Sequence, residues 1–300
     1  MTQQKWVRLS LARLQELLAQ RGHYLDPHTI RRLLADLGYS LKANRKRFTG
    51  PSHADRDRQF RYIGRLKKRF FRAGWPVISV DTKKKELIGD FKNAGTAWCQ
   101  QAEEVNAHDF PQDAVARASP YGIYLPQLDR GYVYIGVSRD TPEFAVDAIA
   151  QWWRGHGRRL FPQARRLLIL ADAGGSNGCR PRLWKVRLQR LADRERLTIT
   201  VCHYPRGASK WNPVEHRLFS FISINWAGKP LRTLEALLGY IGDTETETGL
   251  RVRAVLVVRA YQTGVKVSKR EWESVRLHRH KTCPSWNYTV SPHGRKRSKC

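Results

Sequence analysis

Apolar side chains recur with helical spacing in the first forty residues of the chain. Residues 9–21 carry a leucine stripe, and residues 27–37 carry isoleucine and leucine at i, i+3, i+4 and i+7. Asp26 is placed to cap the second helix, Pro27 to begin it and Gly38 to end it. The pattern predicts two short helices joined by a tight turn.

The polar face of the second predicted helix is basic. His28, Arg31 and Arg32 lie opposite its apolar stripe, where they are placed to enter a DNA groove. Two helices so joined resemble a helix-turn-helix, so we predict a DNA-binding segment over residues 1–50. An ordinary helical hairpin has the same pattern and stays open as an alternative.

Farther along, the hydrophobic period changes from helical to extended. Residues 51–75 contain a basic amphipathic helix that serves as a linker. Beyond it, apolar strand patterns alternate with helical patterns. The predicted strands cover residues 76–81, 122–126, 132–137, 166–172 and 197–204, and the predicted helices cover residues 142–155, 179–195, 213–226 and 230–242.

This order of elements predicts the fold class and the domains. It favours an α/β protein with a mixed sheet flanked by helices, in the strand order of an RNase H-like fold. We place this domain at residues 76–245, with a polar insertion at 83–120. Residues 246–300 form a C-terminal extension with strand pattern at 252–259 and a basic tail.

Composition adds a strong constraint on partners. The chain has 300 residues, 55 Lys and Arg against 26 Asp and Glu, a net charge of +29 and 41% hydrophobic residues. This excess predicts a polyanionic partner, nucleic acid before anionic membrane. No apolar run reaches the ~18 residues of a spanning helix, and the N-terminus lacks a signal-peptide pattern. Five scattered cysteines favour reduced thiols and a cytosolic location.

Two aspartates stand where predicted strands end. Asp81 closes "PVISVD" and Asp172 closes "RLLILAD". If the strands are neighbours, the two carboxylates meet at one sheet edge and repel each other, and a divalent cation such as Mg²⁺ or Mn²⁺ resolves that repulsion. Asp is also common in turns, so each aspartate has a purely structural alternative.

Glu215 is a third acid with two interpretations. In "SKWNPVEHR", Asn212 is placed to cap a helix and Pro213 to begin it. Glu215 then occupies the third helical position, where it suits a capping box. It is equally placed to join the two aspartates, and three acids can hold two metals ~3.5–4 Å apart for phosphodiester chemistry.

Long motifs surround these acids and carry a family resemblance. They read "PVISVDTKKKELIGDFKNAG" (76–95), "EEVNAHDFP" (103–111), "LILADAGGSNGCRPRLWK" (168–185), "TVCHYPRGASKWNPVEHRLFSFISINWAGKPL" (200–231) and "TGLRVRAVL" (248–256). Over residues 20–290 the chain resembles the DDE transposases of bacterial insertion sequences, and more narrowly the Azo-thirteen family.

The resemblance implies an integrase-like catalytic domain. Asp81, Asp172 and Glu215 take the three acidic positions and hold two Mg²⁺ or Mn²⁺ ions. The implied function is metal-dependent cleavage and strand transfer of double-stranded transposon ends and target DNA, by a homodimer on DNA in the bacterial nucleoid. The family has a longer N-terminal region, so we expect a truncated copy. A non-catalytic DNA-binding protein and a plain RNase H-like nuclease remain alternatives.

Several residues near the acids are candidates for DNA contact. Lys83, Lys84 and Lys85 follow Asp81 after a single residue, Thr82. They either contact phosphates near the metals or form a solvated face, and we predict contact. Lys210 and Trp211, just before Glu215, are further candidates, although Trp211 also suits packing.

A short His and Cys cluster offers a different metal site. His278, His280 and Cys283 lie close together in the sequence, as zinc ligands often do. A fourth ligand is missing from the pattern, so zinc is an alternative that we do not predict.

Overall fold

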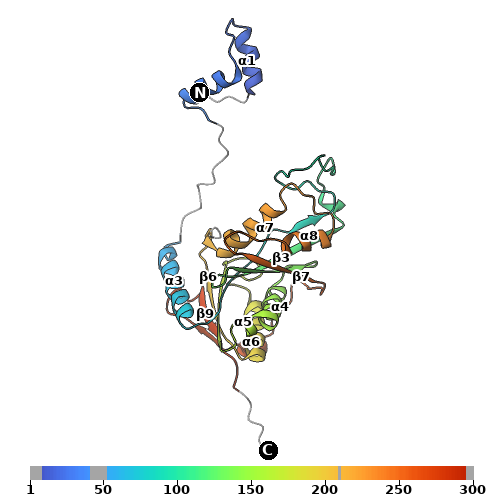
Figure 1. The fold of residues 1–300 in the computed structure, drawn as a ribbon. Coiled ribbons are helices and arrows are strands. Elements are labelled where there is room, and N and C mark those ends of the chain that lie inside the picture. Colours follow the sequence, from blue (N-terminus) through green and yellow to red (C-terminus); the bar gives the residue numbers. More distant parts are fainter. Residues whose placement is uncertain (1–8, 41–52, 209–210, 295–300) are drawn as a thin grey trace, which may run out of the picture. The chain divides into compact units, whose positions relative to one another are not determined.

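A computed structural model describes residues 9–40, 53–208 and 211–294 of the chain (Figure 1). The structure divides into two compact units, residues 1–49 and residues 50–300.

The first unit contains the two predicted helices, α1 (Leu11–Ala19) and α2 (Pro27–Asp36). The Asp26 carboxylate caps α2 by accepting the N–H groups of His28 and Thr29 at 2.8 and 3.1 Å. Ile30 is buried, whereas Leu37 is 72% exposed. The DNA-contact candidates of α2, namely His28, Arg31 and Arg32, are all exposed.

The second unit is an α/β structure. Its strands are β1 (Val77–Thr82), β2 (Glu86–Ile88), β3 (Ala116–Leu125), β4 (Arg130–Gly136), β5 (Arg166–Ala171), β6 (Thr198–His203), β7 (Arg251–Val257), β8 (Leu277–Arg279) and β9 (Asn287–Val290). Its helical elements are α3 (Arg56–Arg72), η1 (Pro111–Asp113), α4 (Pro142–Trp152), η2 (Trp153–Gly157), α5 (Arg158–Leu160), α6 (Arg182–Glu195), η4 (Glu215–Phe219), α7 (Ser220–Asn225), α8 (Leu234–Gly242) and α9 (Lys269–Glu273).

The strands form one mixed sheet in the order β7-β4-β3-β1-β5-β6-β9-β8, with β2 paired to β3. β1 lies between antiparallel β3 and parallel β5, and β6 continues the parallel set. The central order β4-β3-β1-β5-β6 is that of an RNase H-like fold, so the predicted fold class is confirmed. The apolar runs of β1 and β5 belong to strands buried on both faces.

Helices cover both faces of the sheet (Figure 1). On one face, α4 and α6 pack on the strands with Trp152 and Trp184 fully buried. On the other face, η4, α7 and α8 cover the β3-β4-β7 side, and α3 covers β1, β5 and β6. Two layers of helix therefore enclose the sheet, and its ends remain available for a site.

The strands at the two edges of the sheet were incompletely predicted. β7 pairs with β4, and β9 pairs with β6, so residues beyond 245 supply strands on both sides of the predicted domain. The predicted domain and the predicted C-terminal extension, divided at residue 245, therefore belong to one compact unit in the structure. β3 also begins at Ala116, within the expected polar insertion, and there it pairs with the short strand β2.

None of the helices in the described ranges combines the length and apolarity needed to cross a membrane.

Candidate active site

Asp81 and Asp172 are neighbours across two parallel strands. β1 and β5 pair with Val80 opposite Ala171, and the residue that follows each of these two is an aspartate: Asp81 within β1 and Asp172 directly after β5. Paired strands lie about 4.8 Å apart. The fold thus brings the two carboxylates side by side at the carboxyl ends of these strands.

Both aspartates also point to the same face of the sheet. Side chains alternate between faces along a strand, so Asp81 shares a face with Val77, and Asp172 shares one with Leu168 and Leu170. Val77, Leu168 and Leu170 belong to a single buried cluster under α3. The sequence could not establish this common face, because it depends on the register of β1 against β5.

A buried hydrogen-bond network ties the segment before Glu215 to β1. The Ser79 hydroxyl donates to Asn212 Oδ1 and accepts the Val214 N–H at 3.2 Å. Asn212 Nδ2 donates to the Val80 carbonyl at 3.3 Å and to Asp172 Oδ1 at 3.1 Å. Ser79 and Asn212 are both fully buried. The network therefore holds the start of the Glu215 segment against the two aspartate strands.

This placement corrects the predicted capping role of Asn212. The Asn212 side chain bonds to β1 and Asp172 instead of capping the helix, and η4 begins at Glu215 without a side-chain cap. The backbone N–H of Glu215 donates to the Asn212 carbonyl at 3.0 Å. Asn212, which the sequence predicts to be a helix cap, therefore positions Glu215 by anchoring the preceding segment to β1.

The three acids are coupled electrostatically. Burial raises the pKa of Asp81 to about 8, and the nearby charges of Asp172 and Glu215 add to the rise. Burial also raises the pKa of Asp172 to about 6, against the lowering effect of the Asn212 hydrogen bond. The pKa of Glu215 is raised mainly by burial. Asp172 and Glu215 therefore lie close enough to Asp81 to disfavour its ionised form, and Glu215 has the same effect on Asp172.

The acids fit a divalent cation by their chemistry. Three carboxylates supply only oxygen ligands, which suit Mg²⁺ and Mn²⁺, and their mutual repulsion is offset by positive charge. Within residues 9–40, 53–208 and 211–294, no three His, Cys, Asp or Glu side chains are already grouped as a metal site. The fit is one of ligand type and charge rather than of a preformed cage.

A buried histidine fixes the backbone beside Asp172. His203 lies between the Asp172 carbonyl, 2.9 Å from Nδ1, and the Tyr288 hydroxyl, 3.0 Å from Nε2. Tyr288 accepts the Trp184 indole N–H at 2.8 Å, so its own proton points to Nε2 and the His203 Nδ1–H donates to the carbonyl. Burial lowers the pKa of His203 to about 4. The neutral ring therefore acts as a fixed support.

The lysines after Asp81 occupy different environments. Lys83 Nζ lies 2.5 Å from Glu86 Oε1 and 4.7 Å from the centre of the Trp226 ring. Lys84 and Lys85 are exposed. A contact with DNA phosphate is therefore easier for Lys84 and Lys85, because Lys83 already has an anionic partner.

The two candidates before Glu215 are only partly described. Lys210 lies outside the described residues. Trp211 is 52% exposed, and its ring approaches Phe60 of α3 edge-on at 6.2 Å. Trp211 thus both packs on α3 and presents part of its surface near Glu215.

The alternative of a zinc site at the C-terminal cluster has no support in the structure. His280 uses both ring nitrogens, with the Tyr62 hydroxyl at 2.7 Å and the Thr289 hydroxyl at 2.8 Å. Cys283 is buried. The cluster packs β8 and β9 against α3, and the described residues contain no metal group there.

Gly122 is a residue of the site that the sequence analysis missed. It lies opposite Asp81 in β3, and a Cβ there would come within 2.5 Å of Phe219 and 3.0 Å of Val214. The absent side chain lets η4 pack directly on the strand beside Asp81. Only the register of β3 and the position of η4 reveal this requirement.

We expect Gly122→Ala to lower the free energy of unfolding by about 1–3 kcal/mol, because it overpacks this contact. It should also impair cleavage by moving η4, and Glu215 with it. Gly136→Ala is the matched control, since its Cβ would meet Phe144 of α4 at 2.8 Å on the opposite face. Denaturant unfolding measures the first effect and DNA cleavage the second. Equal loss of cleavage in both variants would contradict the positional role of Gly122.

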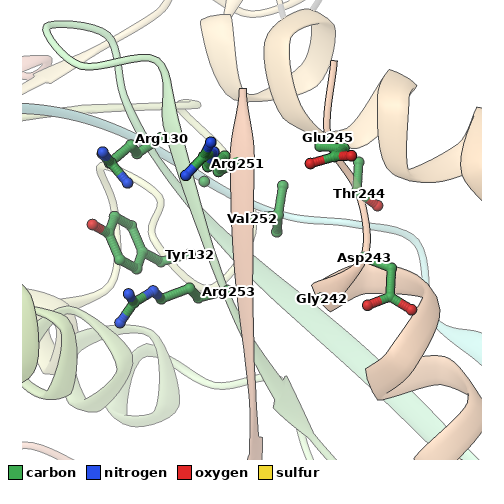
Figure 2. A pocket seen from close by; sticks show the side chains of 10 residues that line it. Arg130, Tyr132, Gly242, Asp243, Thr244, Glu245, Arg251, Val252 and Arg253 are labelled. Carbon is green, nitrogen blue, oxygen red and sulfur yellow. The ribbon is translucent and has the colours of Figure 1, made fainter. Parts of the chain in front are cut away.

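A separate basic pocket lies away from the acids. It encloses about 400 Å³ between β4, β7 and the end of α8. In Figure 2, Arg130, Tyr132 and Arg253 lie on one side of β7, and Asp243 and Glu245 lie on the other. Arg130 pairs with Leu125, toward the end of the sheet where β1 begins. This pocket therefore belongs to a different part of the molecule.

The comparison with protein families decides the identity of the chain. Residues 1–292 match the family described as the Rhodopirellula transposase DDE domain. The chain belongs to this transposase DDE family. The resemblance to the DDE transposases of bacterial insertion sequences is thereby confirmed.

Solved structures show a more distant likeness. A Mos1 transposase paired-end complex with the left transposon end is 14% identical with a TM-score of 0.48, over 80% of this chain and 72% of that chain. The Mos1 strand transfer complex is 14% identical with a TM-score of 0.47, over 80% of this chain and 71% of that chain. A mariner Mos1 paired-end complex with Mn is 13% identical with a TM-score of 0.45, over 80% of this chain and 72% of that chain. Comparison with curated protein sequences gave no match.

Proposed function

We propose that this transposase family member cleaves DNA at transposon ends and joins them to target DNA, with Asp81, Asp172 and Glu215 as ligands of two Mg²⁺ or Mn²⁺ ions. The observation that carries the proposal is the convergence of these three acids at one end of an RNase H-like sheet. The match of the chain to a transposase DDE family supports the proposed activity.

Each protein group has a part in holding this site. When bound, the ions supply an activated water or 3′-hydroxyl and stabilise the leaving oxygen. The Thr82 N–H donates to Asp81 Oδ1 at 2.8 Å and orients that carboxylate. Asn212 orients Asp172, and the same asparagine anchors the segment that carries Glu215. The acids are thus preorganised by backbone and amide groups.

The DNA partner is supported by charge. The net charge of +29 favours phosphate contacts over much of the surface. Lys84 and Lys85 extend from the end of β1, next to the acids. His28, Arg31 and Arg32 are exposed on α2, where they suit contact with base edges. A homodimer that pairs two transposon ends completes the proposal.

Cleavage and joining assays test this function. The purified chain is incubated with a labelled terminal-repeat duplex and a target plasmid, in Mg²⁺, Mn²⁺ or EDTA. We expect metal-dependent cuts at the repeat end, followed by joined products. Binding without cleavage would indicate a non-catalytic DNA-binding protein. Cleavage without joining would indicate an RNase H-like nuclease.

A further inference from the structure

Two pockets that share lining residues lie next to Asp172. The first encloses about 540 Å³ and includes Asp172 and the glycine-rich loop that follows it. The second encloses about 700 Å³ between α6, α9 and the turn before β9. Arg180 and Arg206 line both pockets, so a chain passing the acids can continue from the first pocket into the second.

The second pocket is strongly cationic. Among the described residues, no carboxylate lines it, and five Arg and Lys side chains do: Arg180, Arg182, Lys185, Arg206 and Arg279. In the described part of the chain, none of these five forms an ion pair with Asp or Glu. Like charges in such proximity repel one another, so an anion that enters the pocket is stabilised.

Lys185 makes this charge unusual, because it is only 3% exposed. Its ammonium donates to the Cys179 carbonyl at 2.5 Å and lies 5.2 Å from the centre of the Tyr288 ring. A buried cation without an anionic partner is costly to the fold. Burial accordingly lowers the pKa of Lys185 to about 8. A phosphate bound in the pocket offsets this cost.

The pocket also has aromatic walls. Trp272 of α9 lies under the Arg182 guanidinium, 5.2 Å from the ring centre, and is partly exposed. Trp286 lines the pocket from the turn before β9 and contacts the His53 ring edge-on at 4.7 Å. Aromatic rings next to cations are typical of single-stranded nucleic-acid sites, where bases stack and phosphates pair.

The shape of the pocket selects the form of nucleic acid. Its volume lies within the ~300–1,000 Å³ of pockets that enclose single small ligands. A base that remains stacked and paired in a duplex cannot enter such a pocket, whereas an unpaired nucleotide can. The basic tail of this chain carries the same charge as the pocket and is a poor occupant.

We propose that this pocket binds an unpaired nucleotide of the DNA strand that passes the acids, with its phosphate on Arg180 and Arg206 and its base against Trp272. The proposal rests on the proposed function for the identity of the strand. It adds a site that prefers locally opened DNA to a continuous duplex.

The test measures binding in EDTA, so that it does not depend on cleavage. The probes are a continuous duplex and a matched duplex with one unpaired 2-aminopurine nucleotide. The variant Arg279→Ala/Trp272→Ala removes two pocket groups that do not line the acid pocket. Its control, Arg253→Ala/Trp98→Ala, removes the same residue types, from the pocket in Figure 2 and from an exposed loop position.

We expect the wild-type chain to prefer the unpaired probe and to quench its 2-aminopurine fluorescence on binding. In the Arg279→Ala/Trp272→Ala variant, the ratio of affinity for the unpaired probe to affinity for the continuous duplex should fall by about 5- to 150-fold. This is the effect expected from the loss of base–aromatic stacking. The control should keep the preference. Circular dichroism checks that both variants fold, and the quenching result stands without any variant.

Three results would overturn the proposal: no preference in the wild-type chain, equal loss in the control variant, or stronger competition by polyglutamate than by DNA. The outcomes are separable from those of the proposed function. Cleavage without a preference for unpaired DNA rejects only the pocket. A preference without metal-dependent cleavage rejects only the catalytic function.

Discussion

Asp81→Asn should reduce metal-dependent DNA cleavage by at least about 10²–10³-fold, the cost of losing one preorganised charge-stabilising group. Asp172→Asn and Glu215→Gln should have effects of the same size, because each removes one proposed ligand of the same metal site. Combining the substitutions should not multiply the losses, since the three acids act as one unit. Rates of terminal-repeat cleavage in Mg²⁺ and Mn²⁺ measure the effect.

The same substitutions should leave the fold intact or stabilise it when metal is absent. Each removes one member of a buried group of acids. Burial raises the pKa of Asp81 and Asp172, and repulsion from the neighbouring acids adds to the rise. Asp243→Asn is the control, because Asp243 lines the separate pocket between β4, β7 and the end of α8 (Figure 2). Thermal unfolding distinguishes loss of chemistry from loss of structure. Undiminished cleavage by any of the three variants would refute the role of that acid.

Asn212→Ala should reduce cleavage by about 10²-fold and lower the free energy of unfolding by about 1–3 kcal/mol. The stability loss follows because the buried Ser79 hydroxyl loses its acceptor and the Val80 carbonyl loses a donor. The activity loss follows because the Glu215 segment is no longer anchored to β1, and a shift of about 1 Å in a catalytic group costs about that factor.

Thr141→Ala provides the comparison for Asn212→Ala. Thr141 is also buried, and its hydroxyl caps α4 by accepting the Phe144 N–H at 3.2 Å. Loss of this cap costs about 0.5–2 kcal/mol without touching the acids. If both variants lose similar stability but only Asn212→Ala loses cleavage, the network positions the site. Full cleavage by a folded Asn212→Ala protein would show that Glu215 is held by other contacts.

Much of the fold followed from hydrophobic patterning. The apolar runs before Asp81 and Asp172 predicted buried strands because strands covered on both faces carry few polar residues. β8 and β9 escaped prediction because both are short. β9 pairs with β6, about ninety residues earlier in the chain, and β8 joins the sheet only through β9. The first half of β3 escaped because its pattern is irregular, and its pairing with β2 defines it as a strand.

The sequence by itself determined the types of the main elements, the basic charge and the position of the aspartates at strand ends. These features depend on local periodicity and composition. Only the tertiary structure decided that Asp81 and Asp172 share a face, since that depends on strand register. The tertiary structure also decided the role of Asn212, which the sequence predicts to be a helix cap. Its side chain instead forms buried hydrogen bonds with Ser79 and Asp172, and so holds the segment before Glu215 against β1.

The cationic pocket beside the acids was equally a product of the tertiary structure. Arg180, Arg206, Trp272 and Arg279 come from separate segments, and each alone resembles an ordinary basic or aromatic surface residue. Their grouping arises because β9 pairs with β6 and brings the C-terminal segment against α6. A charge pattern in sequence gives the sign of a surface, whereas the place where charges converge is set by contacts between residues far apart in the chain.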